Sequence, residues 1–227
     1  PKEDTGSSKP AVSVPDLNWT YITLPDGKQI PYYEGVPVST FGEGSFYWNE
    51  AGRLVYAGKD FSTRFGIDVS AYQNRAIPDK TIDWNAAKAD GVEYAFVRIG
   101  LRGTSTGGLN ADTFYAQNLD GAAAAGIDTG VYFFSQAITV EEAVEEANYV
   151  LSLLGGRQLA CPVAYDWEMH DSSYRVYGIS AAMATACAKA FCETIEAAGY
   201  RAMVYTSSYV AYNKFDLSAL SAYPIWY

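Results

Sequence analysis

The sequence predicts an α/β fold in which a parallel sheet is covered by helices and is preceded by a small β appendage. From residue 64 onward, short and nearly continuous apolar strands alternate with helical stretches. This alternation is typical of buried parallel strands joined by crossover helices. Residues 17–63 instead contain short strands separated by turn residues, a pattern that indicates hairpins. Residues 1–16 are polar and contain Pro, Ser and Gly, so we expect a disordered linker.

The appendage is predicted to contain two hairpins. Strands at 21–24 and 29–32 flank Pro25-Asp26-Gly27, which is a hairpin turn signal. Strands at 46–48 and 54–56 flank the turn residues 49–52.

The main domain, residues 64–227, is predicted to have six strands and four helices. The strands are expected at 66–70, 92–99, 129–135, 162–168, 202–206 and 224–227, and the helices at 83–89, 111–125, 140–154 and 179–198. Thr139 with Glu142 matches a capping box, Ser180 is a suitable N-cap, and Gly126 and Gly199 are suitable helix stops.

The strand order leaves two architectures open, a β/α barrel and an open doubly wound sheet. No G-x-G-x-x-G motif follows the first strand, which disfavours a dinucleotide-binding sheet. The glycine-rich stretch 103–108 lacks phosphate-loop spacing and is predicted to be a flexible loop. A regular barrel needs about 200–250 residues. We therefore expect a domain truncated after its sixth strand, or one that closes differently.

Composition restricts the partners. The formal net charge of −10 disfavours nucleic acid and electrostatic docking on an anionic membrane. The sequence contains no apolar run of about 18 residues, so it predicts no membrane-spanning helix. The three cysteines do not form a disulfide framework, and we interpret Cys161, Cys187 and Cys192 as small buried hydrophobes. The polar N-terminal stretch resembles a linker after a removed export signal, so we expect a secreted or cell-surface monomer.

Three carboxylates are the candidate catalytic groups because they lie at predicted strand ends, where parallel α/β folds gather reactive side chains. Asp68 lies late in the first strand, and Asp166 and Glu168 end the fourth. Strand side chains alternate, so Asp166 and Glu168 should face the same side. Mutual repulsion should raise the pKa of at least one of them. A protonated carboxyl beside an ionised one is what cleavage of a glycosidic bond requires.

His170, the only histidine, allows an alternative. It lies two residues after Glu168 and could join Asp68, Asp166 and Glu168 around a metal ion. Because zinc sites commonly use two or more histidines, we expect a loop histidine without catalytic duty and no metal or cofactor.

Aromatic and polar side chains near the same strand ends are candidates for ligand binding. The aromatic rings suit the faces of sugars. The plain alternative is that the aromatic residues form core layers and that the polar residues are structural. The candidates are Tyr132, Phe134, Tyr205 and Trp226, together with Gln73 and Arg98.

An ordered series of motifs over residues 64–227 resembles the glycoside hydrolase family 25 lysozymes, the Chalaropsis-type N,O-diacetylmuramidases. The motifs are FGIDVS with Gln73, IDW, GV before FVR, GVYFF, PVAYDWE, and GY before VY. The ordered series is specific, whereas each motif alone is not.

The resemblance implies an irregular, TIM-like β/α barrel that cleaves the β-1,4 bond between N-acetylmuramic acid and N-acetylglucosamine without a cofactor. It implies that Glu168 is the general acid. Asp166 would stabilise the transition state or orient the substrate's acetamido group, and Asp68 would complete the acidic cluster. Retaining and inverting mechanisms both stay open. Members of the family continue into two further strands, the last of which contributes another Asp, so the acidic cluster is expected to lack one member here.

Two other functions are kept beside this one. The chain could be a cell-wall-binding module that has lost turnover, or a metal-dependent hydrolase that uses His170. The appendage is expected to cover one face of the main domain, with wall binding as its functional alternative.

Overall fold

A computed structural model describes residues 20–23, 27, 29–32, 41 and 44–227. The expected linker, residues 1–16, lies outside the described residues. The two expected hairpins are present. Strands β1 (Thr20–Thr23) and β2 (Gln29–Tyr32) pair antiparallel, as do β3 (Phe46–Trp48) and β4 (Leu54–Tyr56).

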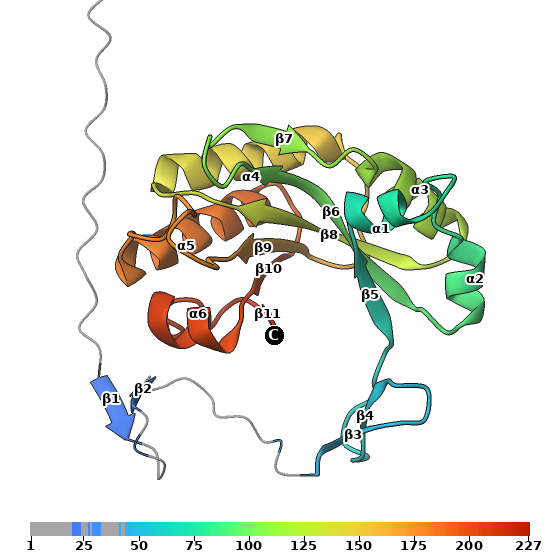
Figure 1. Ribbon diagram of the computed structural model, residues 1–227, viewed down its shortest axis with the longest axis horizontal. Coiled ribbons are helices and arrows are strands. Elements are labelled where there is room, and N and C mark those ends of the chain that lie inside the picture. The colour runs from blue at the N-terminus through green and yellow to red at the C-terminus, as the bar shows by residue number, and fades with distance from the viewer. Residues whose placement is uncertain (1–19, 24–26, 28, 33–40, 42–43) are drawn as a thin grey trace, which may run out of the picture.

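The main domain is built on one curled sheet (Figure 1). Its strands are β5 (Gly66–Val69), β6 (Tyr94–Arg102), β7 (Leu109–Ala111), β8 (Asp128–Ser135), β9 (Val163–Trp167), β10 (Ala202–Tyr205) and β11 (Ile225–Trp226). The order is β11-β10-β9-β8-β6-β5, with parallel pairing throughout, and β7 pairs antiparallel with β6. The parallel sheet forms a half-barrel, which confirms the TIM-like α/β class.

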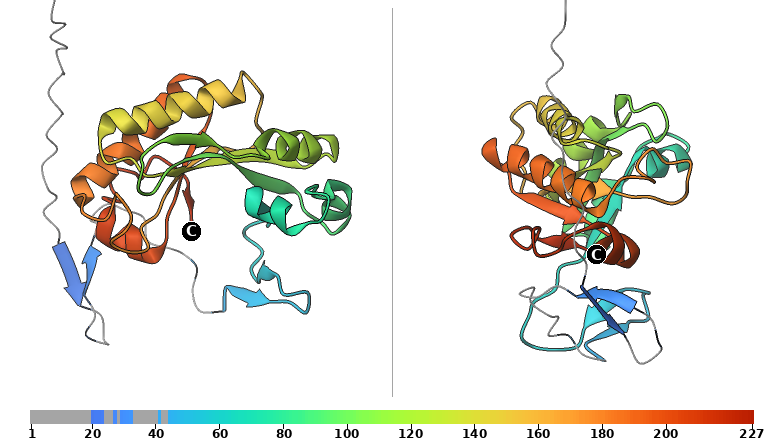
Figure 2. Two further views of the ribbon diagram at one scale, coloured as in Figure 1. Left: turned by 45° about the horizontal axis from the view of Figure 1, so that its top comes forward. Right: turned by 90° about the vertical axis from the view of Figure 1, so that its left-hand side faces the viewer.

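Helices cover the outer face of this sheet (Figure 2). The helices are α1 (Ala71–Ala76), α2 (Trp84–Ala89), α3 (Tyr115–Ala124), α4 (Val140–Leu154), α5 (Ala181–Ala197) and α6 (Ser208–Lys214). The helices α3, α4 and α5 pack on the strands, and α4 also packs on α5. No helix in the described part of the chain is long and apolar enough to cross a membrane.

The core lies between these helices and the sheet because the strands are apolar along almost their whole length. In β9 all residues are buried, and Val163, Tyr165 and Trp167 belong to the main apolar cluster. Cys187 and Cys192 are buried in α5, as expected. Cys161, expected to be buried as well, is only half-buried, because it lies in the bend before β9 and not in the strand itself.

The helix ends follow the predicted caps, with one correction. Ser180 accepts a hydrogen bond from the Met183 amide, and Gly126 and Gly199 adopt the positive φ angles that favour glycine. Thr139 caps α4 by accepting from the Glu142 amide. The Glu142 carboxylate instead accepts from the Ile138 amide, so the expected reciprocal box is incomplete.

Three elements were not predicted. Helix α1 depends on a local capping box between Ser70 and Gln73, in which the side-chain Oε1 atom of Gln73 accepts from the Ser70 amide at 2.8 Å. Strand β7 pairs with the end of β6, which runs past the expected Ile99 after a register shift between Arg98 and Gly100. The stretch 103–108, predicted to be a flexible loop, forms the turn between these strands. It is closed by a bond from the Gly103 amide to the Gly108 carbonyl.

The third element that was not predicted is helix α6. Its seven residues are too few to show a helical periodicity in the sequence. It is capped by Ser207, which accepts from the Val210 amide.

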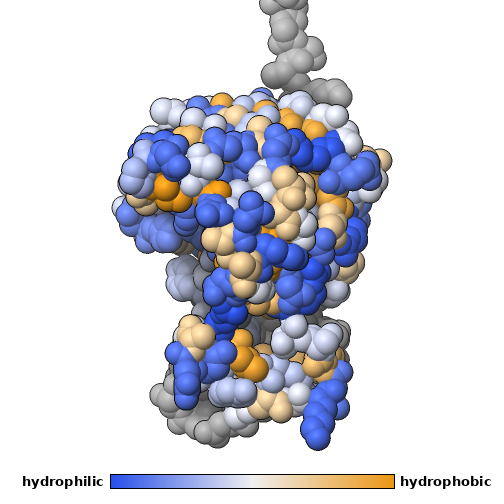
Figure 3. All heavy atoms as spheres, turned by 90° about the vertical axis from the view of Figure 1, so that its right-hand side faces the viewer, coloured by the Kyte–Doolittle hydropathy of each residue, from blue (hydrophilic) through white to orange (hydrophobic). Residues whose placement is uncertain are grey.

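The β3–β4 hairpin exposes a cluster of apolar side chains. Trp48 is 70% exposed, and the rings of Phe41, Phe46, Tyr56 and Phe61 contact one another edge to face or tilted. Figure 3 shows hydrophobic residues reaching the surface among hydrophilic ones, on the hairpin segment as well as on the domain above it.

Candidate active site

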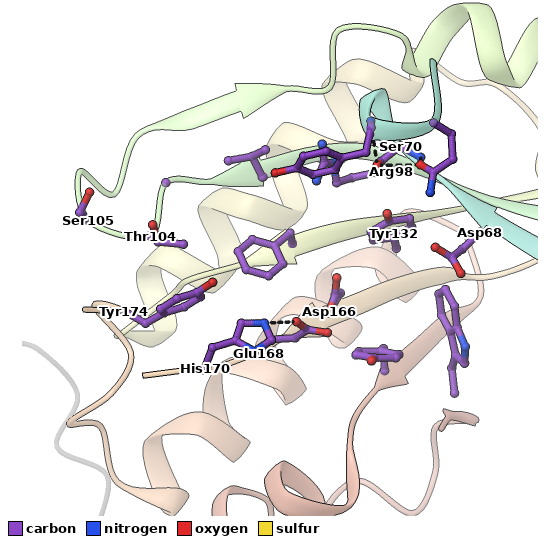
Figure 4. Close-up of a pocket in the computed structure, with 17 residues that line it drawn as sticks. Asp68, Ser70, Arg98, Thr104, Ser105, Tyr132, Asp166, Glu168, His170 and Tyr174 are labelled. Atoms are coloured by element: carbon purple, nitrogen blue, oxygen red, sulfur yellow. Dashed lines mark hydrogen bonds and ion pairs between the residues drawn. The ribbon is translucent and has the colours of Figure 1, made fainter. Parts of the chain in front are cut away.

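A cavity of about 660 Å³ opens at the carboxyl ends of the parallel strands. It contains every side chain selected from the sequence as a site candidate (Figure 4). These residues are Asp68, Asp166 and Glu168, with Gln73, Arg98, Tyr132, Phe134, Tyr205 and Trp226. They come from β5, α1, β6, β8, β9, the residue after β9, β10 and β11, so the curl of the sheet is what brings them together.

The three carboxylates face this cavity from two strands. Asp68 lies in β5, Asp166 lies in β9, and Glu168 follows β9 directly. Both Asp166 and Glu168 line the cavity, as the alternation of strand side chains requires. Asp166 is only 7% exposed, whereas the Glu168 side chain is 26% exposed. The site therefore pairs a buried carboxyl with one that is open to ligand.

Asp166 has the environment of a carboxyl that holds its proton. Burial raises its pKa well above the ordinary value, and the charges of Glu168 and Asp68 raise it further, while Arg98 lowers it. Its Oδ1 atom is buried and has no hydrogen-bond partner. Burial also raises the pKa of Asp68, which is more open to solvent. The expected pKa elevation within the pair therefore falls on Asp166.

Arg98 supplies the positive charge of the cavity and is held by a buried carboxylate. Its Nε and Nη2 atoms lie 2.9 and 2.8 Å from Oδ2 of Asp112. The Asp112 carboxylate also accepts from the amides of Ala71 and Phe114. The Arg98 guanidinium lies 5.2 Å from the centre of the Tyr72 ring. Asp112 thus ties β6 to the start of α1 and fixes Arg98 at the cavity wall.

Aromatic rings form the wall next to Asp68 and Asp166. The Trp226 ring lies 5.2 Å from Tyr205, 6.0 Å from Tyr132 and 4.9 Å from Phe96, measured between ring centres. Burial raises the pKa of Tyr205 to about 12, with a further contribution from Glu168 and Asp166. Burial also raises the pKa of Tyr132, so both tyrosines stay neutral hydrogen-bonding groups near the carboxylates.

Several residues of the cavity were not selected from the sequence. Tyr72, Thr104, Ser105 and Tyr174 lie on a short helix and on loops, where no periodicity marks them. His170 was expected to be a loop residue without catalytic duty. In the structure its Nε2 atom lies 2.9 Å from Oε2 of Glu168, and its ring meets the Tyr174 ring edge to face.

The metal alternative gains no support from the arrangement of ligands. Within the described ranges, no group of three or more His, Cys, Asp or Glu side chains is arranged to hold a metal ion.

A buried polar network lies behind Glu168 and was not foreseen. The Gln136 side-chain amide donates to the Glu168 carbonyl at 2.8 Å and to the Ser135 carbonyl at 3.0 Å. Glu146, fully buried in α4, accepts from the Ser135 hydroxyl at 2.5 Å and from Nε of Arg102 at 2.7 Å. Burial raises the pKa of Glu146 to about 7, although Ser135 and Arg102 oppose this. The network fixes the end of β8 and, through Gln136, the main chain at Glu168.

Arg175 extends this network to the rim of the cavity. Its guanidinium makes a bidentate ion pair with Glu142, in which Nη1 lies 2.9 Å from Oε2 and Nη2 lies 2.8 Å from Oε1. The guanidinium also donates to the Gln136 carbonyl. The Arg175 amide donates to the Thr104 carbonyl at 2.8 Å. The segment after β9 is therefore joined to the turn between β6 and β7.

Reactive groups gather at the strand ends in barrel-type enzymes, and carboxyl groups that share a cavity in unequal environments are what cleavage of a glycosidic bond requires. The sequence model of Glycosyl hydrolases family 25 matches residues 67–227. The chain belongs to this family. No curated protein sequence matches the chain.

Solved structures with a similar fold include members of the same family. A lysozyme from Streptomyces coelicolor is 26% identical, with a TM-score of 0.53, and the match covers 67% of each chain. A family 25 glycosyl hydrolase from Bacillus anthracis is 18% identical, with a TM-score of 0.59, over 74% of this chain and 71% of that chain. The modular autolysin LytC from Streptococcus pneumoniae is 23% identical, with a TM-score of 0.56, over 86% of this chain and 40% of that chain. The chain thus spans less than half the length of LytC.

Proposed function

We propose that the protein is a muramidase that hydrolyses the β-1,4 bond between N-acetylmuramic acid and N-acetylglucosamine in bacterial peptidoglycan. Membership of family 25 supports this activity. The observation that carries the proposal is that the buried Asp166, the accessible Glu168 and Asp68 line one aromatic-walled cavity. Cleavage of a glycosidic bond needs two carboxyl groups in different environments.

Glu168 is the general acid in this proposal because its carboxyl is the one that ligand can reach. It lies just beyond β9, with its side chain partly exposed and its main chain held by Gln136. A carboxyl in this position can give its proton to the oxygen of the departing sugar. Asp166 orients the acetamido group, to which its protonated carboxyl can donate, or stabilises the positive charge that develops on the sugar once its own proton has left, and Asp68 completes the acidic cluster from β5.

The remaining wall of the cavity binds the sugar chain. The rings of Tyr132, Phe134, Tyr205 and Trp226 provide apolar faces, and the polar groups of Gln73 and Arg98 provide hydrogen bonds. With a net charge of −10, the protein holds an anionic wall polymer by short-range contacts rather than by its overall field. Its place of action is the cell wall, outside the membrane, and we propose that it acts there as a monomer.

Digestion of purified peptidoglycan tests this function. Mass spectrometry of the released fragments should find N-acetylmuramic acid at the reducing ends. Fragments ending in N-acetylglucosamine would contradict the assignment of the bond. Binding to peptidoglycan without any released fragment would instead support a wall-binding module without turnover.

A further inference from the structure

His170 contacts the carboxyl group to which the proposed function assigns the role of general acid. Its Nε2 atom lies 2.9 Å from Oε2 of Glu168, and both side chains line the cavity. Figure 4 shows the imidazole beside this carboxyl, with a dashed line between the two groups. The other members of the acidic cluster are carboxyl groups, which cannot donate a hydrogen bond to Glu168 when they are ionised, whereas an imidazole N–H can.

The Glu168 side chain needs such a contact to keep one orientation. The Gln136 amide holds the Glu168 main chain, but several rotatable bonds separate that main chain from the carboxyl group. The side chain is 26% exposed, so packing around it does not by itself fix the carboxyl. The contact with His170 holds the carboxyl by one of its two oxygens. It therefore selects one orientation of the group toward a ligand in the cavity.

The imidazole is held in turn by the segment that follows it. Its ring meets the Tyr174 ring edge to face, with 5.3 Å between the ring centres. The Tyr174 amide donates to the Asp171 carbonyl at 3.2 Å, and the next residue, Arg175, makes the bidentate ion pair with Glu142. The His170 side chain is 63% exposed, so these contacts rather than burial set the position of the ring.

A hydrogen-bond donor at Oε2 favours the loss of a proton from Oε1 of the same carboxyl. In protonated Glu168, Oε2 is a neutral carbonyl oxygen, which accepts from Nε2 of His170 when Nε2 carries a hydrogen. When the proton leaves, the group becomes a carboxylate, and a hydrogen bond to an ionised acceptor is roughly twice as strong as a neutral one. The bond therefore strengthens in the transition state, and interactions of this kind raise kcat.

We propose that His170 is the positioning residue of the general acid, and that its Nε2–H group donates to Oε2 of Glu168 so that Oε1 carries the proton toward the glycosidic oxygen. The inference rests on the proposed function and adds a partner for Glu168. In the reaction, the Oε1 proton moves to the glycosidic oxygen. The bond from that oxygen to the sugar that develops positive charge breaks, with its electron pair on the oxygen. Water then supplies the hydroxyl of that sugar and the proton that restores Glu168.

Two replacements separate the hydrogen bond from the packing of the ring. His170→Phe keeps an aromatic ring against Tyr174 but has no N–H, whereas His170→Gln keeps a side-chain N–H for Oε2 but loses the ring. On a peptide-free glycan of alternating N-acetylglucosamine and N-acetylmuramic acid, kcat of His170→Phe should fall by about tenfold with KM unchanged, the effect of one hydrogen bond to a charged group. His170→Gln should retain most of the wild-type kcat. The reverse order of the two variants would overturn the inference, because the packing of the ring would then be what matters.

The acidity of the leaving group shows whether the effect acts through Glu168. Two aryl glycosides carry the same sugars, with methoxyphenol or dinitrophenol in place of the departing sugar. The more acidic phenol needs less help from a general acid, so the loss in His170→Phe should stay near tenfold on the methoxyphenyl glycoside and shrink to about twofold or less on the dinitrophenyl glycoside. Glu168→Gln should show the same trend with larger losses. Equal losses on the two aryl glycosides would overturn the inference, because His170 would then bind sugar or support the fold.

A further measurement detects the contact without turnover. His170 is the only histidine in the sequence, so NMR can assign its imidazole nitrogen signals directly. Near neutral pH, the Nε2 signal of the wild type should show a bound hydrogen, and the signal should shift in Glu168→Ala, which removes the acceptor. An Nε2 signal that is the same in both proteins would overturn the inference and leave the muramidase activity intact. A wild-type protein that cleaves neither the glycan nor the aryl glycosides would refute the proposed function, and the inference with it.

Discussion

Replacement of Gln136 by leucine tests whether the buried network positions Glu168. Leucine has a similar volume but cannot donate the bonds to the Glu168 and Ser135 carbonyls, which are 2.8 and 3.0 Å long. Leaving a buried acceptor unpaired costs roughly 1–3 kcal/mol. The leucine also removes the Gln136 Oε1 atom, which is itself buried without a hydrogen-bond partner, and this removal offsets part of the cost. We expect a net loss of about 1–3 kcal/mol in the free energy of unfolding.

The loss of stability should lower Tm, and the loss of the bond to the Glu168 main chain should lower kcat. For a domain of this size, each kcal/mol lowers Tm by about 2–4 °C. Because a displacement of about 1 Å near a reacting group can cost up to 10²-fold, we expect kcat on peptidoglycan to fall by about 10- to 100-fold. KM should change little, since the aromatic wall is untouched.

Gln158→Leu is the matched control for this experiment. Gln158 is an exposed glutamine that bonds only weakly, at 3.4 Å, to the Gly156 carbonyl, so its replacement should alter neither Tm nor kcat. The reasoning is refuted if Gln136→Leu lowers Tm but leaves kcat within about twofold of the wild type. Gln136 would then support the fold without positioning Glu168.

Two further predictions concern the neighbours of Glu168. Burial raises the pKa of Asp166, so the folded state binds its proton more tightly, and this contribution to stability is lost as pH rises above the unfolded value of about 3.9. Asp166→Asn should therefore have a higher Tm than the wild type near pH 7, with the difference shrinking at pH 3–4 in thermal scans, and an equal difference at both pH values would contradict this. Trp167 is fully buried against Phe215 on the opposite side of β9, so Trp167→Phe should lower stability by about 1–3 kcal/mol but retain most activity, measured by denaturant unfolding and peptidoglycan digestion. A loss of activity as large as that of Glu168→Gln would show that the alternation along β9 is misinterpreted.

The parallel strands could be predicted because their signal is local. The stretches that became β8 and β9 each contain a nearly continuous run of apolar residues, which is typical of a buried parallel strand. Elements that depend on partners were missed. Strand β7 exists because its backbone pairs with the end of β6, and nothing in Leu109–Ala111 alone indicates a strand. Helix α1 is six residues long and depends on its cap.

The candidate site also divides into features with a local signal in the sequence and features that depend on contacts made in the fold. The carboxylates could be predicted because a strand end and a two-residue spacing are visible in the sequence. Their unequal environments were not visible, because the burial of Asp166 depends on packing from neighbouring strands. The contact of His170 with Glu168 and the bond from Gln136 to the Glu168 carbonyl also join side chains whose proximity the sequence does not state.

The most direct test of the proposed mechanism is the rate of peptidoglycan cleavage by Glu168→Gln relative to the wild type. Glutamine keeps the shape of the side chain but has no proton to give, so the rate should fall by about 10²–10⁴-fold while circular dichroism and Tm show an intact fold. A folded Glu168→Gln protein that cleaves peptidoglycan at the wild-type rate would contradict the assignment of Glu168 as the general acid.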